Sequence, residues 1–174
     1  MNQPFVIWLT GLSGSGKTTI AKILKDKLEI MGKTVEILDG DIIRRMFPHT
    51  GYDEQSRMDH IMKVGFIAGL LEKHNVCSIV SLISPYTEAR NFARMQCKNF
   101  IEVYLSTPIE ICEERDVKGL YSMARSGEIT NFTGIGAPYE VPVNPDINLD
   151  TSTESEYTSA RRVYSLLEKR ELVY

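Results

Sequence analysis

The sequence predicts one α/β domain built on a parallel β-sheet with helices on both faces. Short apolar runs alternate with longer segments of helical periodicity, and a glycine-rich loop joins the first run to the first such segment. The 174 residues, 43% of them apolar, suit a single core. Five apolar runs have the length of strands: 5–9, 34–38, 76–83, 100–105 and 147–149. We therefore expect a five-stranded parallel sheet in one domain spanning residues 1–174.

The segments between the apolar runs carry helix signals. Residues 19–31 are amphipathic, and Gly32 follows them where a helix commonly ends. Pro108 suits the first turn of a helix, and the last helix is expected over about residues 154–169. Within residues 55–73, apolar and glycine positions recur at helical spacing, which predicts that the Met and Phe side chains among them pack in the core: Met58, Ile61, Met62, Gly65, Phe66, Gly69 and Leu70.

Residues 119–145 break this alternation. Glycines and prolines interrupt any regular element there: Gly127, Gly134, Gly136, Pro138, Pro142 and Pro145. A long structureless stretch inside a compact domain is commonly an active-site lid. We therefore expect a mobile lid over about residues 115–145, called the lid segment below.

Charge and cysteine content argue against several classes of protein. A net charge of −3 and a pI near 5.7 provide no basic face for a nucleic-acid polymer. Three widely spaced cysteines favour reduced thiols over a disulfide framework or a zinc ribbon: Cys77, Cys97 and Cys112. The sequence has neither a basic leader nor ~18 uninterrupted apolar residues. We expect a cytoplasmic protein with no membrane partner.

The most specific motif is the loop at 11–18, which reads GLSGSGKT and fits the pattern G-x-x-x-x-G-K-[ST]. Successive backbone N–H groups of such a loop converge on phosphate oxygens, and the dipole of the following helix adds to the attraction. Lys17 is expected to reach the β- and γ-phosphates of ATP, and Thr18 to ligate Mg²⁺. The motif therefore predicts a P-loop NTPase fold in which these residues bind ATP: Gly11, Ser13, Gly14, Ser15, Gly16, Lys17, Thr18 and Thr19.

Charged and polar residues follow two of the expected strands. Ligands of open α/β sheets bind beyond the carboxyl ends of the strands, so Asp39 and Asp41 are candidates to support Mg²⁺ or to accept a proton from an attacking hydroxyl. The same pair is also compatible with an acidic turn that caps the next helix. Arg44 is placed to clamp an anionic acceptor. The third run ends near Ser84 without a carboxylate, so Ser84 is either a phosphate contact or a turn residue.

Basic residues gather at the start of the lid segment, including Lys118 and Arg125. They either neutralise charge that develops on a transferring phosphoryl group or form a solvated loop. With the phosphate loop and the acidic pair they favour an enzyme of phosphoryl transfer. A GTP- or ATP-binding switch protein is the alternative, but the chain lacks an N-K-x-D segment and its D-x-x-G match, 116–119, lies in the lid segment. A nucleotide-binding subunit without catalysis is a third possibility.

Several longer segments resemble the adenylylsulfate (APS) kinases, which transfer the γ-phosphate of ATP to the 3′-hydroxyl of adenosine 5′-phosphosulfate. The resemblance covers almost the whole chain and rests on these segments: IWLTGLSGSGKTT (7–19), LDGD (38–41), ISPY (83–86), EVYLSTPIEICEERDVKGLY (102–121), GEITNFTGI (127–135) and PYEVPVNPD (138–146). It implies a homodimeric enzyme of sulfate assimilation whose partner is a small-molecule nucleotide acceptor.

The resemblance also implies roles for individual residues. It matches Ser84 to a serine described in this family as a phosphorylated intermediate, although direct in-line transfer needs only positioning and charge stabilisation. From the motif and the acidic pair we assign Thr18 and Asp39 to the metal, and we assign Arg115 to ATP. The catalytic residues are Lys17, Asp39, Asp41, Ser84 and Lys118. The acceptor pocket is lined by Arg44, Arg57, Ile83, Ser84, Lys118, Gly119, Leu120 and Phe132, and we add Asp41.

Departures from the family pattern lie on the acceptor side. DGDIIRRMFP at 39–48 stands where the family usually has DGDNVRHGLN, and one residue is missing between Arg44 and Arg57. Tyr52 replaces a Phe that stacks on a base, and His60 replaces an Asn with different hydrogen-bonding groups. We expect Phe47, Tyr52 and His60 to contact the acceptor. That acceptor is adenosine 5′-phosphosulfate or, alternatively, another nucleotide such as a cytidine diphosphate derivative or phosphoramidate used in capsule or polysaccharide modification.

Overall fold

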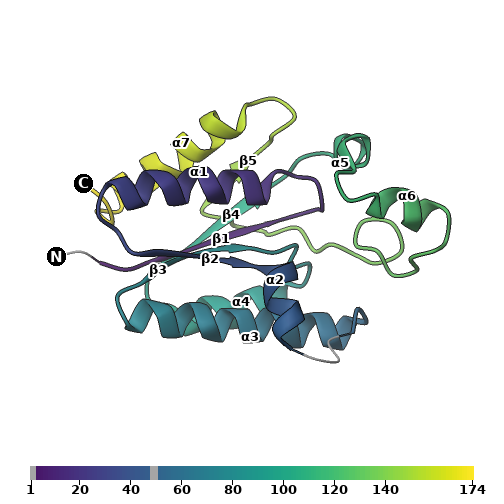
Figure 1. The fold of residues 1–174 in the computed structure, drawn as a ribbon, viewed down its shortest axis with the longest axis horizontal. Coiled ribbons are helices and arrows are strands. Elements are labelled where there is room, and N and C mark those ends of the chain that lie inside the picture. Colours follow the sequence, from purple (N-terminus) through teal and green to yellow (C-terminus); the bar gives the residue numbers. More distant parts are fainter. Residues whose placement is uncertain (1–2, 48–50) are drawn as a thin grey trace.

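A parallel sheet lies between two layers of helices in the computed structural model, which describes residues 3–47 and 51–174 (Figure 1). The five strands have the order β2-β3-β1-β4-β5, and all four pairs are parallel. The strands are β1 Val6–Gly11, β2 Val35–Asp39, β3 Cys77–Ser81, β4 Phe100–Leu105 and β5 Ile147–Leu149. The predicted five-stranded parallel sheet is confirmed, although β3 ends two residues before the predicted boundary.

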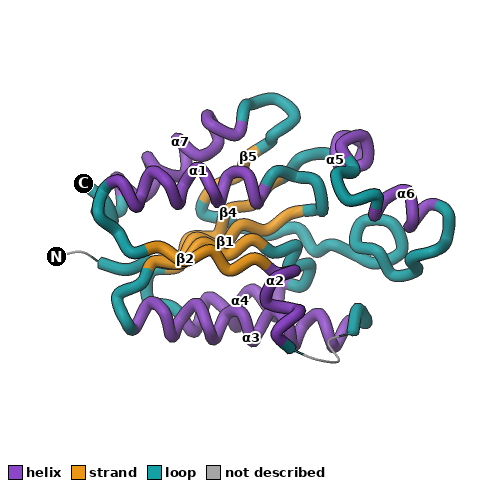
Figure 2. Tube along the Cα trace, viewed as in Figure 1, coloured by secondary structure: helices purple, strands orange, loops and turns teal. Residues whose placement is uncertain are grey.

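Helices cover both faces of this sheet. Figure 2 shows α1 and α7 on one face and α2, α3 and α4 on the other, as predicted for alternating strands and helices. The helices are α1 Lys17–Ile30, α2 Gly40–Met46, α3 Glu54–Lys73, α4 Thr87–Gln96, α5 Ile109–Arg115, α6 Leu120–Arg125 and α7 Glu156–Lys169. Side chains cap three of them. Asp39 caps α2, Asp53 accepts from the N–H of Ser56 in α3, and Ser155 accepts from that of Thr158 in α7. None of the described helices has the length and apolar character to cross a membrane.

The central strand β1 supplies side chains to both cores. Phe5, just before the strand, and then Ile7 and Leu9 pack with the α1 and α7 side chains, whereas Val6 and Trp8 pack against α3 and α4. All five side chains are fully buried. Burial on both faces explains why the sequence of β1 is a continuous apolar run rather than an alternating one. It also holds the phosphate loop, which follows β1 directly, on a rigid base.

Helices α3 and α4 approach each other closely at two glycines. A Cβ on Gly65 would lie 2.6 Å from the Cβ of Ala93, and a Cβ on Gly69 would lie 2.4 Å from the carbonyl oxygen of Gln96. The glycine face of α3 is therefore the face against α4. As a result the Phe66 side chain is 58% exposed, and the prediction that it packs in the core is wrong. Met58 and Met62 are partly buried and pack at the edge of the core.

The lid segment is more ordered than predicted. Helix α6 lies within it, and its side chains Tyr121 and Ala124 form a small apolar cluster with Cys112 and Phe132. The rings of Tyr121 and Phe132 meet edge to face, with centroids 4.9 Å apart. The prediction of a structureless stretch from residue 119 is wrong, because a six-residue helix is too short for periodicity to detect. Figure 1 shows that α5 and α6 lie beyond the carboxyl ends of the strands.

Candidate active site

The phosphate loop turns from β1 into α1 around the side chain of Lys17. Gly14 and Gly16 adopt φ angles of 78° and 94°, in the left-handed region that favours glycine. The Lys17 ammonium donates hydrogen bonds to the carbonyl oxygens of Gly11 and Leu12 at 2.9 and 2.6 Å. Burial lowers the pKa of Lys17 to about 8, and the nearby positive charge of Lys118 acts in the same direction.

ATP affinity should therefore fall as the pH rises through about 8. Lys17 is charged below its pKa and neutral above it, so a pKa of about 8 leaves about 3% of the side chains charged at pH 9.5. If ATP binds only to the charged form, the dissociation constant rises about 30-fold between pH 7 and 9.5. Calorimetric titration of ATP into the wild type and Lys17→Arg measures this. The arginine variant stays charged, so its affinity should not vary with pH over this range. A constant wild-type affinity would contradict the prediction.

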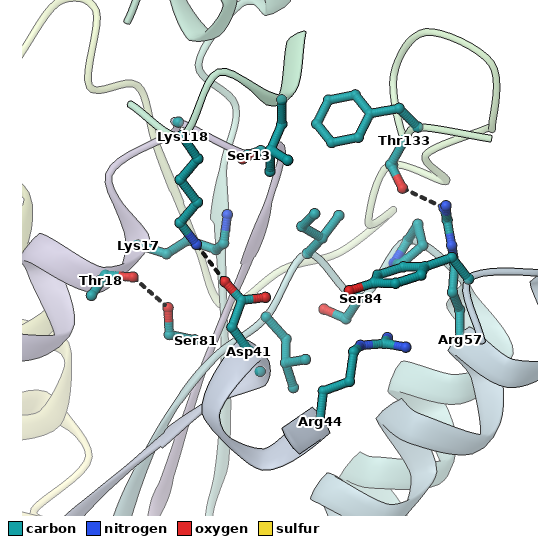
Figure 3. A pocket seen from close by; sticks show the side chains of 18 of the residues that line it. Ser13, Lys17, Thr18, Asp41, Arg44, Arg57, Ser81, Ser84, Lys118 and Thr133 are labelled. Atoms are coloured by element: carbon teal, nitrogen blue, oxygen red, sulfur yellow. Dashed lines mark hydrogen bonds and ion pairs between the residues drawn. The ribbon is translucent and has the colours of Figure 1, made fainter. Parts of the chain in front are cut away.

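The hydroxyl of Thr18 lies at the carboxyl ends of β2 and β3. Its Oγ1 is 3.3 Å from the Oγ of Ser81. Figure 3 marks this hydrogen bond with a dashed line. Ser81 is the register partner of Asp39 on the neighbouring strand, so Thr18, Ser81 and Asp39 form one group of oxygen atoms along this edge of the sheet. Sequence reasoning did not select Ser81. The only signal was its place at the end of the third strand, where many P-loop enzymes carry a carboxylate.

Asp39 and Asp41 have different environments. The Asp39 Oδ1 accepts hydrogen bonds from the N–H groups of Asp41 and Ile42, at 3.0 and 3.2 Å, and so caps α2. The capping interpretation of the acidic pair is thus confirmed for Asp39. Asp41 lies in the first turn of α2, and its exposed carboxylate forms an ion pair with Lys118 of the lid segment (Figure 3). The structure therefore joins two predicted catalytic residues that are 77 positions apart.

Two arginines line the acceptor side of the site. The Arg44 guanidinium lies over the ring of Tyr52, 4.5 Å from its centroid, and donates to the carbonyl of Gly51 at 2.6 Å. Arg57 is 9% exposed and donates to the hydroxyl of Thr133 at 2.6 Å and to the carbonyl of Asn131. Arg57 thus connects α3 to the lid segment, a contact that the sequence did not predict.

His60 is buried on α3 with one ring nitrogen free. Its Nε2 is 3.2 Å from the carbonyl oxygen of Gly40, whereas Nδ1 has no partner among residues 3–47 and 51–174. Burial, and after it the charge of Arg44, lower the pKa of His60 to about 4, so the ring is neutral near pH 7. With the Nε2–H donating to Gly40, Nδ1 remains a hydrogen-bond acceptor.

Ser84 follows β3 and is held from the core. The indole Nε1 of Trp8 donates to the Ser84 Oγ at 3.1 Å, and Ser84 is 1% exposed. Its φ angle of 41° is uncommon for a residue other than glycine. The turn interpretation of Ser84 agrees with this geometry, and its hydroxyl already has a buried partner.

Arg115 joins the phosphate loop to the loop after β5. It donates to the carbonyl of Gly14 at 3.2 Å, and to the hydroxyl and carbonyl of Thr151 at 2.8 and 2.7 Å. The Thr151 hydroxyl in turn lies 3.1 Å from the carbonyl oxygen of Ser15 and donates to it. Sequence reasoning missed Thr151 because no motif marks a residue that reaches the loop from the far end of the chain.

A cavity of about 880 Å³ at the carboxyl ends of the strands joins these groups, a size typical of ligand sites. The predicted residues that line it are Ser13, Gly14, Gly16, Lys17, Thr18, Thr19, Asp39, Asp41, Arg44, Tyr52, Arg57, His60, Ile83, Ser84, Arg115, Lys118, Leu120 and Phe132. Gly11, Ser15 and Gly119 shape the loops beside it instead. Phe47 does not line the cavity, so the structure gives no support to its predicted contact with the acceptor. The ring packs against the α3 core, with the Lys63 ammonium 5.3 Å from its centroid.

This arrangement suits phosphoryl transfer. The phosphate loop occupies one end of the cavity, the two arginines line the other, and Lys118 reaches from the lid segment to Asp41 between them. Such transfer depends almost entirely on positioning and on charges placed around the phosphoryl group. The fold and the site define the protein as a P-loop phosphotransferase.

Comparison with known proteins gives the family. The family model for adenylylsulphate kinase matches residues 3–150. The adenylyl-sulfate kinase of Rippkaea orientalis is 46% identical over 168 residues, which are 96% of this chain and 93% of that protein. A solved structure of the Mycobacterium tuberculosis APS kinase CysC in complex with AMPPNP and APS has a TM-score of 0.92 and 38% identity, and covers 97% of this chain and 99% of that one. A hexameric APS kinase from Thiobacillus denitrificans has a TM-score of 0.75 and 26% identity, over 99% of this chain and 30% of that one.

The chain belongs to the adenylylsulphate kinase family and is an ATP-dependent kinase. The resemblance inferred from the sequence motifs is thereby confirmed. The names of these relatives favour adenylyl sulfate as the acceptor and give no support to a cytidine nucleotide.

Proposed function

We propose that this protein transfers the γ-phosphate of ATP to the 3′-hydroxyl of adenosine 5′-phosphosulfate, as a cytoplasmic enzyme of sulfate assimilation. The observation that carries the proposal is the single cavity in which Lys118 pairs with Asp41 between the phosphate loop and the acceptor side chains. One cavity of this kind brings a donor phosphate and an acceptor hydroxyl within reach of the same charged groups. The family resemblance further implies a homodimer, which sedimentation of the purified protein tests.

On the ATP side, the loop amides and Lys17 bind the phosphates. Phosphate oxygens replace the loop carbonyls as partners of the buried Lys17 ammonium and stabilise its charged form, because a nearby anion raises a lysine pKa. Arg115 and Thr151 hold Gly14 and Ser15 of the loop in place.

The oxygen atoms beside the phosphate loop fit Mg²⁺. This ion prefers oxygen ligands, keeps several waters, and binds through one or two carboxylates together with substrate phosphates. The described residues contain no cluster of three or more His, Cys, Asp or Glu side chains for a metal, which agrees with a site completed by phosphates and water. Thr18 and Asp39 would hold the ion, which neutralises charge on the β- and γ-phosphates when bound.

On the acceptor side, Asp41 accepts the proton of the attacking hydroxyl. Its carboxylate is exposed to the cavity, and Lys118 fixes its position while adding positive charge beside the transferring group. Arg44 and Arg57 bind the anionic part of the acceptor together with the backbone N–H groups of Ile83 and Ser84. Tyr52 and Phe132 stack on the base, and Nδ1 of His60 accepts from a donor group of the acceptor.

Initial rates with ATP and a panel of acceptors test this proposal. The panel holds adenosine 5′-phosphosulfate, a cytidine diphosphate derivative, an adenosine diphosphate derivative and dephospho-coenzyme A. We expect kcat/KM above ~10⁴ M⁻¹s⁻¹ for adenosine 5′-phosphosulfate, inside the usual enzyme range, with the new phosphate on the 3′-oxygen. Turnover of the cytidine compound without turnover of adenosine 5′-phosphosulfate would overturn the assigned acceptor.

A further inference from the structure

We propose that Trp8 and Arg90 are positioning residues, which hold the backbone at Ile83–Ser84 in the conformation that binds the anionic part of the acceptor. The inference rests on the proposed function, in which the N–H groups of this segment face the acceptor. Ile83 and Ser84 line the cavity, whereas Trp8 and Arg90 do not. Both residues must therefore act through Ser84.

The segment has the geometry of an anion-binding turn. Neither the Ile83 nor the Ser84 amide donates a hydrogen bond to any residue within 3–47 or 51–174. Ser84 has a φ angle of 41°, a conformation that L residues adopt at a cost in free energy. Successive N–H groups next to a left-handed residue form a concavity that attracts anions. Such a conformation persists only where the surrounding structure holds it.

Buried donors hold both polar ends of Ser84. The Trp8 indole N–H, in a side chain that is 0% exposed, bonds to the Ser84 hydroxyl at 3.1 Å. Nη1 of Arg90 bonds to the Ser84 carbonyl at 2.7 Å, and Arg90 is 2% exposed. The Glu102 Oε1 lies 3.1 Å from the Arg90 Nε, and this ion pair neutralises the charge of Arg90. Trp8 of β1 thus holds the hydroxyl of Ser84, and Arg90 of α4 holds its carbonyl.

The neighbouring carbonyls are also held. Thr10 donates to the carbonyl of Ile83 at 2.7 Å, and the N–H of Glu140 donates to the carbonyl of Pro85 at 2.8 Å. Arg90 also donates to the carbonyl of Glu140 at 2.7 Å, which connects the end of the lid segment to the same turn. The carbonyls of Ile83, Ser84 and Pro85 therefore have partners, while the N–H groups of Ile83 and Ser84 donate to none of the described residues. This asymmetry points to a ligand rather than to packing alone.

Trp8→Phe tests the first anchor. It removes the N–H donor and keeps an aromatic ring, so we expect the KM for adenosine 5′-phosphosulfate to rise about 3- to 10-fold, as for the loss of one hydrogen bond. The KM for ATP should stay within about twofold. Phe100→Leu is the control, because the Phe100 and Trp8 ring centroids are 5.6 Å apart but Phe100 has no hydrogen-bonding group to offer Ser84. Equal rises of the acceptor KM in both variants would overturn the proposal.

Arg90→Lys tests the second anchor, since lysine keeps the charge beside Glu102 but cannot bond to several partners in a fixed fork. The expected result is the same selective rise of the acceptor KM. Arg94→Lys is the matched control on the same helix, because Arg94 pairs with Glu102 and Asp146 but makes no bond to Ser84. An unchanged acceptor KM in Arg90→Lys would show that Arg90 does not position Ser84.

The double variant Trp8→Phe/Ser84→Ala distinguishes action through Ser84 from a general loss of structure. If Trp8 acts through the Ser84 hydroxyl, the double variant has the same acceptor KM as Ser84→Ala alone, whereas additive effects refute this route. Trp8 is the single tryptophan of the chain. Its fluorescence emission maximum should therefore shift in Ser84→Ala and stay unchanged in Ser81→Ala, and an unshifted emission in both refutes the bond.

Failure of the inference differs from failure of the proposed function. A wild-type enzyme that does not turn over adenosine 5′-phosphosulfate refutes the proposed function. An active wild type with unchanged acceptor KM in Trp8→Phe and Arg90→Lys refutes the positioning roles and leaves the function intact.

Discussion

Lys17→Ala should lower kcat/KM for ATP by about a thousandfold, the upper range for removing one charge-stabilising donor from an active site. Lys17 is the buried cation of the phosphate loop, and its ammonium is held by the loop carbonyls at the place where phosphate oxygens enter. The substitution removes the positive charge that lies beside bound ATP and beside the transferring phosphoryl group. The values of kcat and ATP affinity therefore fall together. Steady-state kinetics and calorimetric ATP titration measure the two effects.

Lys22→Ala is the matched control for this variant. Lys22 lies on the same helix α1, but its side chain is exposed and does not line the cavity. Its kinetics should match the wild type. Near-normal turnover by Lys17→Ala would count against the assignment of the phosphate loop as the ATP site.

Asp41→Asn should lower kcat by about 10²- to 10⁴-fold, the usual contribution of a general base, with little change in ATP affinity. Asparagine keeps the size of the side chain and loses the carboxylate that accepts the proton and pairs with Lys118. Because Asp39 rather than Asp41 supplies the cap of α2, the helix should remain folded. Single-turnover rates of phosphate transfer measure the chemical step directly.

Asp59→Asn provides the comparison for Asp41→Asn. Asp59 is an exposed carboxylate on α3 that accepts a hydrogen bond from Gln55 and does not line the cavity. An unchanged kcat in Asp41→Asn would transfer the proton-accepting role to Asp39. Asp39→Asn should instead weaken the cap of α2 and the support for Mg²⁺.

Features that depend on neighbours in the sequence were predictable. The phosphate loop needs glycine at positions with positive φ, a lysine and a hydroxyl in fixed order, and all of these lie within eight residues. The strands were predictable because each reads as an apolar run, and β1 and β3 are buried throughout. The family resemblance then placed distant residues such as Arg44 and Lys118 in one pocket before their contacts were known.

Features that depend on which face of an element is covered were not predictable. Phe66 has the periodicity of a core residue but lies outside, because α4 takes the glycine face of α3. Phe47 was assigned to the acceptor pocket by its place in a motif, yet its ring packs against α3. Helix α6 escaped detection because its stability comes from the cluster around Tyr121 and Phe132 rather than from local propensity.

The sequence by itself determined the P-loop fold, the phosphate-loop motif and the family, because each follows from local motifs and from the alternation of apolar runs. Only the tertiary structure decided which distant groups meet: Asp41 with Lys118, Arg57 with Thr133, and Trp8 with Ser84. The physical reason is that a hydrogen bond between residues some 75 positions apart depends on how the sheet and helices pack. Local motifs specify the atoms of the site, and packing specifies their partners.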